Sequence, residues 1–165
     1  MPIFMHYQSI HGDARDANGH DGWIDIEETH FQGIHRSITS ATSTRSDRES
    51  ANADLGEMEL IRSMDRASPA LFLQSCCGKG SDMTLHLTKT TSTGSGTDIY
   101  LEVVLRNALI SRYTTVARRQ SRRRPAEKLK VSFTALELRY IPYDDDGNML
   151  PPMSVGYDKT RNKLI

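Results

Sequence analysis

The chain has 165 residues, with 21 basic and 21 acidic side chains, a formal net charge of zero at pH 7 and 37% hydrophobic residues. This length suits one domain that buries roughly 70% of its unfolded surface. The longest apolar runs are only a few residues, which excludes a transmembrane helix. A neutral chain is also a poor candidate for sequence-independent binding to DNA phosphates. The first residues lack the basic region and the long apolar core of a secretory signal.

The zero net charge conceals an uneven distribution along the chain. Residues 1–60 carry 11 acidic and 4 basic side chains, which gives −7, and the remaining 10 acidic and 17 basic side chains give +7. The two parts attract each other, either within one molecule or between copies.

The first 36 residues favour two strands separated by a loop. Residues 3–8 are a short, mainly apolar segment, and the polar, glycine-containing stretch that follows is typical of a loop. A second strand begins at Trp23 and extends toward Ile34, but the parity of its apolar positions changes between Ile26 and Phe31. Such a change indicates a bulge or a bend.

Residues 37–54 have neither a helical nor a strand period and almost no apolar content. A structureless stretch of this length is uncommon inside a compact domain. It is either a surface loop or an arm that becomes ordered against a partner. We therefore predict a single domain over residues 1–165 with an extended loop at about 37–54.

A strand is predicted over residues 57–64, and the one convincing helix follows it. Ser68 is expected as the N-cap, Pro69 as the first helical residue and Gly78 as the residue that stops the helix. Its apolar face indicates that this short helix packs on a sheet.

The second half of the chain is dominated by strands. Apolar and polar residues alternate over residues 83–88, which predicts a half-buried strand, and residues 90–97 form a hairpin turn. Further strands are expected over 99–105, 109–116 and 129–143. The last of these carries apolar residues on both faces and must be covered on both sides. Several strands, short turns and one helix predict a mostly β fold, a compact antiparallel two-sheet β-barrel or sandwich with one short α-helix.

Cysteine and histidine spacing gives no support for a metal site or a cofactor. Cys76 and Cys77 are adjacent, and two cysteines do not form a disulfide framework, so a reducing cytosol is the expected folding compartment. At least one of the two is expected to be a small buried apolar side chain rather than a reactive thiol. The six histidines show no His-x-x-x-His spacing and there is no Cys-x-x-Cys.

The acidic segment that begins at Asp144 has some likeness to a calcium loop, but Met149 and Val155 occupy its sixth and twelfth positions in place of Gly and Glu. A turn closed by Gly147 accounts for it better. No nucleophile elbow, P-loop or dinucleotide motif occurs, so the sequence predicts no catalytic residue and no enzyme.

Residues 118–124 hold five arginines in seven positions, the strongest charge feature of the chain. Like charges this close repel one another in a regular element, so an exposed loop is expected. Three interpretations stay open: a solvated loop, docking onto an acidic protein surface, and nucleic-acid binding. The last is disfavoured because no aromatic side chain interrupts the run.

Eight short motifs follow one another in a characteristic order and spacing. They are Trp-Ile-Asp-Ile at 23–26, Met-Asp-Arg-Ala-Ser-Pro at 64–69, Gly-Lys-Gly at 78–80, Ile-Ser-Arg-Tyr at 110–113, Arg-Pro-Ala-Glu at 124–127, Val-Ser-Phe at 131–133, Tyr-Ile-Pro-Tyr at 140–143 and Val-Gly-Tyr-Asp at 155–158. In this order the chain resembles the haemolysin-coregulated protein (Hcp) family, the tube subunit of bacterial type VI secretion systems. The resemblance covers nearly the whole chain.

The resemblance implies a β-barrel with one side helix that assembles into a hexameric ring. Rings of this family stack into a tube inside a contractile sheath, are capped by a spike protein and carry small effector proteins in the lumen. The subunit would be made in the bacterial cytoplasm and secreted without a signal peptide to the extracellular space or a target cell. Neither a nucleic acid, a membrane nor a cofactor is implied as a partner.

Two departures from the family pattern coincide with the segments that we expect at subunit or ring-stacking interfaces. The loop at 37–54 is rich in Ser, Thr and charge rather than glycine, and the segment before Arg124 is rich in arginine. The strand from Ile24 to Ile34 is expected to contribute to the inner wall, with His30 and Gln32 facing cargo. The expected interface residues are Thr39, Ser43, Arg45, Asp47, Arg48, Glu49, Arg118, Arg119, Arg122, Arg123 and Arg124.

Two other functions remain possible on the sequence alone. One is a phage-like tail tube protein, which residues do not separate from the secretion tube. The other is a small β-barrel binding module that recognises an acidic partner or RNA through residues 118–124.

Overall fold

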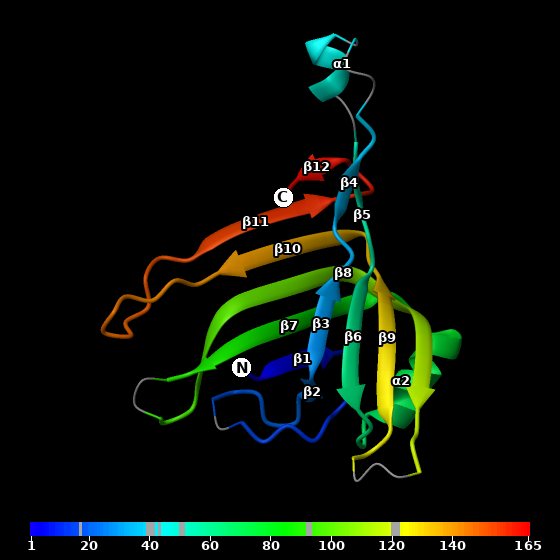
Figure 1. The fold of residues 1–165 in the computed structure, drawn as a ribbon, viewed down its shortest axis with the longest axis vertical. Coiled ribbons are helices and arrows are strands. Elements are labelled where there is room, and N and C mark those ends of the chain that lie inside the picture. Colours follow the sequence, from blue (N-terminus) through cyan, green and yellow to red (C-terminus); the bar gives the residue numbers. More distant parts are fainter. Residues whose placement is uncertain (17, 39–41, 43, 50–51, 92–93, 120–122) are drawn as a thin grey trace.

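The computed structural model describes the chain except for residues 17, 39–41, 43, 50, 51, 92, 93 and 120–122. The described part is mostly β, with two short helices (Figure 1). The elements are β1 (Ile3–Tyr7), β2 (Ile24–Ile26), β3 (Glu28–Phe31), β4 (Ile34–Arg36), α1 (Arg45–Glu49), β5 (Ala53–Leu55), β6 (Met58–Ser63), α2 (Ser68–Cys77), β7 (Ser81–Thr90), β8 (Thr97–Val116), β9 (Ala126–Ser132), β10 (Ala135–Tyr140), β11 (Met153–Asp158) and β12 (Lys163–Leu164).

Ten of the strands form one antiparallel network with two parts that share β8. Sheet A has the order β2-β1-β7-β8-β10-β11-β12, and sheet B has the order β3-β6-β9-β8. The first half of β8 pairs with β7 and β10, and its second half pairs with β9. Asn107 has a left-handed backbone (φ 51°) where β8 changes partners. The break that the sequence predicts at this residue is therefore a bend within one long strand.

The network is not closed, so the predicted barrel is wrong. In the described part of the chain, β2 lies at one edge of sheet A and β3 at one edge of sheet B, and the two do not pair. Glu27 lies between them, and its N–H donates to the carbonyl of Ile61 at 2.9 Å. The change of parity predicted between Ile26 and Phe31 is the place where the chain passes from sheet A to sheet B.

The long strand predicted over residues 129–143 is interrupted for the same reason. β9 ends at Ser132 in sheet B, and β10 begins at Ala135 in sheet A. Leu129 and Leu136, which would point to opposite faces of one strand, both enter the core between the sheets. In one continuous strand, the side chains of Leu129 and Leu136 would lie on opposite faces and could not enter the same core.

The core lies between the two sheets and beneath α2. Sheet A contributes fully buried Met5, Leu85 and Leu105, and sheet B contributes Leu60 and Leu129. Burying a side chain of this size contributes about 1.5–3 kcal/mol, so this set dominates the stability of the fold. No helix in the described residues is both long and apolar enough to cross a membrane.

The predicted helix is confirmed as α2, with a different N-terminus. Ala67 occupies the N-cap position and Ser68 is already helical. The carboxylate of Asp65 accepts a hydrogen bond from the Ala67 N–H at 2.8 Å, and the hydroxyl of Ser68 accepts one from the Asp65 N–H at 3.1 Å. Gly78 ends the helix as predicted, donating its N–H to the Gln74 carbonyl.

Both cysteines at the end of α2 are exposed, which contradicts the prediction of a buried side chain. The side chain of Leu71 takes the buried position of this short helix instead.

The turns predicted at residues 90–97 and at Gly147 are both present. The Thr91 N–H donates to the Gly96 carbonyl across the β7–β8 connection, and the N–H of Gly147 (φ 85°) donates to the Asp144 carbonyl. The C-terminal strands β11 and β12 were not predicted from the sequence.

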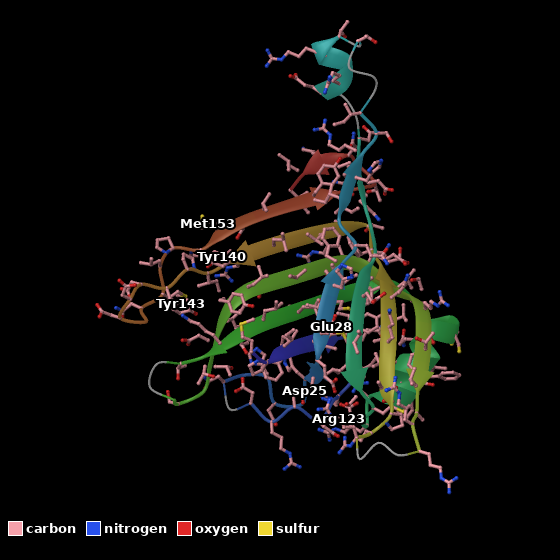
Figure 2. All side chains as sticks on the ribbon, viewed as in Figure 1. Asp25, Glu28, Arg123, Tyr140, Tyr143 and Met153 are labelled. Atoms are coloured by element: carbon pink, nitrogen blue, oxygen red, sulfur yellow. The ribbon has the colours of Figure 1, made fainter. Side chains whose placement is uncertain are left out.

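Residues 37–54 are not uniformly structureless in the described part. β4 and β5 form a separate hairpin in which Ile34 pairs with Leu55 and Arg36 with Ala53, and α1 lies between them in the chain. The hairpin with α1, which we call the arm, projects from one end of the molecule (Figure 1). Arg123, which precedes β9, lies at the opposite end (Figure 2).

Candidate interaction surfaces

Sheet B turns one face to the core and the other outward. On the outward face, the strand register places His30, Glu59, Lys130 and Arg112 side by side across β3, β6, β9 and β8. His30 and Gln32, which we predicted to face cargo, are both exposed. His30 belongs to this row, and Gln32 follows β3 with its N–H bonded to the Glu57 carbonyl at 3.0 Å.

The outward face of sheet B is charged rather than apolar. Lys128 Nζ lies 2.7 Å from Glu59 Oε1, and this hydrogen bond lowers the pKa of Glu59. A hollow of about 270 Å³ lies between the strands here. It is lined by Glu59, Arg112, Thr114, Lys128 and Lys130. A face of this kind stays hydrated and suits polar contacts with a passing molecule better than a sealed interface.

A row of apolar side chains crosses sheet A and becomes exposed at its far end. The register aligns Ile24, Met5, Leu85, Val103, Leu138 and Val155, from β2 to β11. The first four are buried, whereas Leu138 is 37% and Val155 56% exposed. At this position the cover of sheet A ends before β11, so the apolar pattern continues beyond the part of the sheet that is covered (Figure 1).

The exposed end of that row belongs to a larger apolar surface. Tyr140 pairs with Met153 at the next position along β10 and β11, and both side chains are exposed (Figure 2). A groove of about 220 Å³ runs between this surface and the base of the arm. It is lined by Ile34, Ala53, Leu55, Leu136, Leu138, Val155, Gly156, Tyr157 and Leu164. Contiguous exposed apolar surface of this kind marks a protein–protein contact. We call Leu138, Tyr140, Met153, Val155 and Leu164 the apolar strip.

The predicted interface residues of the arm are partly described. Arg45, Arg48 and Glu49 lie in α1 and are exposed, and Arg45 Nε lies 2.7 Å from Glu49 Oε1. Thr39 and Ser43 lie outside the described residues, as does the side chain of Asp47.

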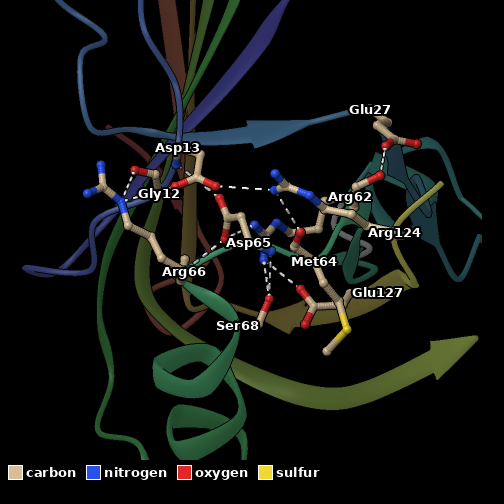
Figure 3. A network of polar contacts seen from close by, with 12 residues as sticks. Gly12, Asp13, Glu27, Arg62, Met64, Asp65, Arg66, Ser68, Arg124 and Glu127 are labelled. Carbon is tan, nitrogen blue, oxygen red and sulfur yellow. Dashed lines mark hydrogen bonds and ion pairs between the residues drawn. The ribbon is translucent and has the colours of Figure 1, made fainter. Parts of the chain in front are cut away.

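The arginine segment lies at the other end of the molecule, after β8. Arg118, Arg119 and Arg123 are exposed, and Arg122 lies outside the described residues. Arg124 is exposed as well but has partners in the same molecule: its Nη1 lies 3.2 Å from Asp13 Oδ2 and donates to the Met64 carbonyl at 3.3 Å (Figure 3).

Asp13 also links this end of the molecule to α2. Arg66 Nε lies 3.2 Å from Asp13 Oδ1 and donates to the Gly12 carbonyl at 2.7 Å (Figure 3). The acidic first part and the basic second part of the chain thus meet within one molecule, at Asp13 and at the Lys128–Glu59 pair. The attraction inferred from the charge distribution is in part intramolecular.

A buried ion network was not foreseen from the sequence. Arg62, fully buried on β6, donates to Glu127 of β9 at 2.5 Å and also pairs with Asp65 (Figure 3). Tyr113 of β8 donates to the same Glu127, and burial together with this contact raises the pKa of the Tyr113 hydroxyl. The network ties three strands to the start of α2. A signal for this network was available in the sequence. Arg62 and Glu127 each occupy a position that the alternation of their strand assigns to the apolar, buried face.

The described residues contain no group of three or more His, Cys, Asp or Glu side chains arranged to hold a metal ion. Four surface features stand out in this part of the chain: the apolar strip, the projecting arm, the charged outward face of sheet B and the arginine segment.

Comparison with known families identifies the class. Residues 4–140 match the family model described as "Type VI secretion system effector, Hcp". The chain belongs to the Hcp family and is a tube subunit of a type VI secretion system. The family is one of structural tube proteins, not of enzymes.

Solved structures share the fold at low sequence identity. A protein described as a type six secretion system protein is 18% identical with a TM-score of 0.87, and the match covers 99% of each chain. Hcp1 from Salmonella typhimurium is 21% identical with a TM-score of 0.75, over 99% of this chain and 98% of that one. Hcp2 from the same organism is 20% identical with a TM-score of 0.70, over 99% of each chain. No curated protein matches the chain.

Proposed function

We propose that residues 1–165 form one tube domain that assembles into a hexameric ring, and that the apolar strip is the main contact between neighbouring subunits. A ring needs a heterologous contact, in which one surface of a subunit meets a different surface of the next. The strip supports this proposal because its side chains continue the apolar row of sheet A beyond Val103, the last residue of that row that is buried within the subunit. Leu138 and Val155 would be buried by a neighbour in the way that Leu85 and Val103 are buried by sheet B.

We further propose that rings stack head to tail through the two ends of the molecule. The arm and the arginine segment lie at opposite ends of the long axis, which supports a contact between the arm of one ring and the arginine-bearing rim of the next (Figure 1). Of the interface residues expected from the sequence, Arg45, Arg48 and Glu49 on the arm and Arg118, Arg119 and Arg123 on the rim are exposed.

The outward face of sheet B is proposed as the wall of the lumen. It carries His30 together with Glu59, Lys130 and Arg112, and its hydration favours weak contacts that let a small effector protein be held and later released. In this function the subunit is made in the bacterial cytoplasm and leaves the cell within the tube, in contact with a spike protein and a contractile sheath.

The ring is tested by substituting one residue of the strip. Val155→Asp places a charge in the proposed contact and is expected to convert rings into monomers, because an unpaired buried carboxylate is strongly disfavoured. Leu73→Asp is the matched control, since Leu73 is 57% exposed on α2, away from the strip. Negative-stain images and light scattering of the full chain report the assembly state.

The expected result is rings for the unaltered chain and for Leu73→Asp, and monomers for Val155→Asp. A strictly monomeric unaltered chain at high concentration would contradict the ring. Rings that persist in Val155→Asp would move the contact to another surface.

A further inference from the structure

Four polar side chains form a continuous chain of hydrogen bonds on the face of sheet A that points away from the core. His20 Nδ1 lies 2.6 Å from Asp16 Oδ2, and His20 Nε2 lies 2.8 Å from His86 Nδ1. His86 Nε2 then lies 2.9 Å from Glu102 Oε2. Asp16 and His20 come from the loop between β1 and β2, whereas His86 and Glu102 are cross-strand partners on β7 and β8. We call these four residues the histidine chain.

The histidine chain is shielded from water and is the main polar attachment of this loop to the sheet. His20 is only 1% exposed, and its ring stacks on Phe4 with centroids 4.4 Å apart. Trp23 lies against His86 and His20, with ring centroids 4.7 and 5.0 Å away. Thr97 donates to Asp16 at 2.8 Å.

Two further ionisable groups face the chain from neighbouring strands. His6 of β1 contacts Trp23 on the other side, with ring centroids 5.2 Å apart. Arg139 of β10 lies 3.9 Å from Glu102 Oε1. Neither is hydrogen-bonded to the two imidazoles, although the charge of His6 adds to the lowering of the pKa of His86.

The number of protons in the chain follows from its three contacts. A carboxylate–imidazole, an imidazole–imidazole and an imidazole–carboxylate contact each need one proton between the two heavy atoms. Two neutral imidazoles supply only two protons, and two lone pairs would then face each other across one contact. Three protons complete the chain and give the histidine pair one positive charge between two carboxylates. A fourth proton places two N–H groups against each other at the central contact.

We propose that the histidine chain is a proton-operated latch that fastens the β1–β2 loop to sheet A only while the pair holds one extra proton. The latch opens when the pair loses that proton and when it gains a second one. The same loop carries Asp13, which binds Arg66 and Arg124, so opening the latch also frees the arginine-bearing end of the molecule from its anchor.

The opening of the latch at low pH agrees with the surroundings of His86 and Asp16. Burial lowers the pKa of His86, and the hydrogen bond to Glu102 only partly opposes this. A base with a lowered folded pKa favours folding above the ordinary histidine pKa of about 6.5, and this contribution declines as the pH falls below it. Burial alone would raise the pKa of Asp16, but hydrogen bonds from His20 and Thr97 lower it overall, so this carboxylate stays ionised through that range.

The proton count is measured directly by ¹⁵N NMR of the imidazole nitrogens in the unaltered chain. At the pH of greatest loop protection, three of the four nitrogens of His20 and His86 should carry a proton. Hydrogen exchange of Gly12, Ala14 and Gly22, whose amides bond within the loop, reports its fastening. Their protection should fall on both sides of an optimum, by about tenfold per pH unit at the steepest point, the slope of one linked proton.

Two neutral imidazoles at the optimum, or loop protection that stays constant from about pH 5 to pH 9, would overturn the latch. These measurements do not depend on ring formation, so they stand apart from the test of the tube proposal.

A variant distinguishes the opening of the latch at low pH from its opening at high pH. Trp23 is the only tryptophan, and its fluorescence senses the adjacent charged imidazole. In His86→Gln the amide cannot gain a proton, so the acidic transition of Trp23 emission should disappear while the alkaline one remains. His6→Gln is the control, since His6 also contacts Trp23 but lies outside the chain, and it should keep both transitions. An acidic transition that survives in His86→Gln and is lost in His6→Gln would assign the pH response to His6 and refute the latch.

Discussion

The buried pair of Arg62 and Glu127 is the residue-scale feature on which the fold depends most. Both side chains are fully buried, and their partners Asp65, Ser68 and Tyr113 come from the β6–α2 connection, α2 and β8. Removing the charge of Glu127 leaves Asp65 to compensate the buried Arg62 alone, which costs more than the Arg62–Glu127 pair itself contributes.

We predict that Glu127→Gln lowers the free energy of unfolding by about 3 kcal/mol. Glu59→Gln is the matched control, because it breaks an ion pair between the same two strands on their exposed face, where water replaces the lost contact. Urea unfolding of both variants at neutral pH measures the difference. Equal midpoints for the two variants would show that the buried network is not the stabilising one.

At the scale of elements, β8 serves both sheets because it bends at Asn107. The backbone there is left-handed, a conformation that costs most L-residues about 1 kcal/mol or more and that Asn and Gly adopt readily. We expect Asn107→Ala to destabilise the protein by about 1 kcal/mol, and Asn107→Gly to stay close to the unaltered protein. Thermal unfolding of the two variants distinguishes them. A stable Ala variant would mean that the bend is set by the neighbouring strands alone.

The arm projects from the body of the molecule, and we expect the body to fold without most of it. His35 pairs with Asp54 in its hairpin, so residues 36–53 can be replaced by Asn-Gly, a two-residue turn that suits a hairpin. The shortened chain should unfold close to the midpoint of the full chain, because Leu55 and the core are kept. It should form rings and no tubes, as seen by negative-stain microscopy. Tubes of normal length in this variant would remove the arm from the stacking contact.

At the scale of the whole molecule, the apolar strip and the arginine segment predict different responses to salt. Apolar contacts are little affected by screening, whereas contacts between exposed charges weaken when the Debye length falls to a few ångströms. Raising the salt concentration to about 0.5 M should therefore shorten tubes while leaving rings intact. Sedimentation and images of the same sample measure both. Rings that dissociate before tubes shorten would reverse the roles of the two surfaces.

The sequence determined those features that depend on local chemistry. The β character followed from alternation at 83–88, the C-terminal limit of α2 followed from Gly78, and the interruption near Asn107 was visible as a break between two apolar segments. The order of short motifs identified the family. These signals survive because each is carried by residues close together in the chain.

The tertiary structure alone decided what depends on distant pairing. The apolar residues on both faces of 129–143 were interpreted as one strand covered twice, but the chain crosses between sheets at Phe133 and Thr134 and turns both sets into one core. The barrel proved open because β2 and β3 are joined by chain and not by hydrogen bonds. Arg62 meets Glu127, and His20 meets His86, across 65 and 66 positions. A single sequence states which residues carry charge or apolar surface, whereas only the packed chain states which of them share a site.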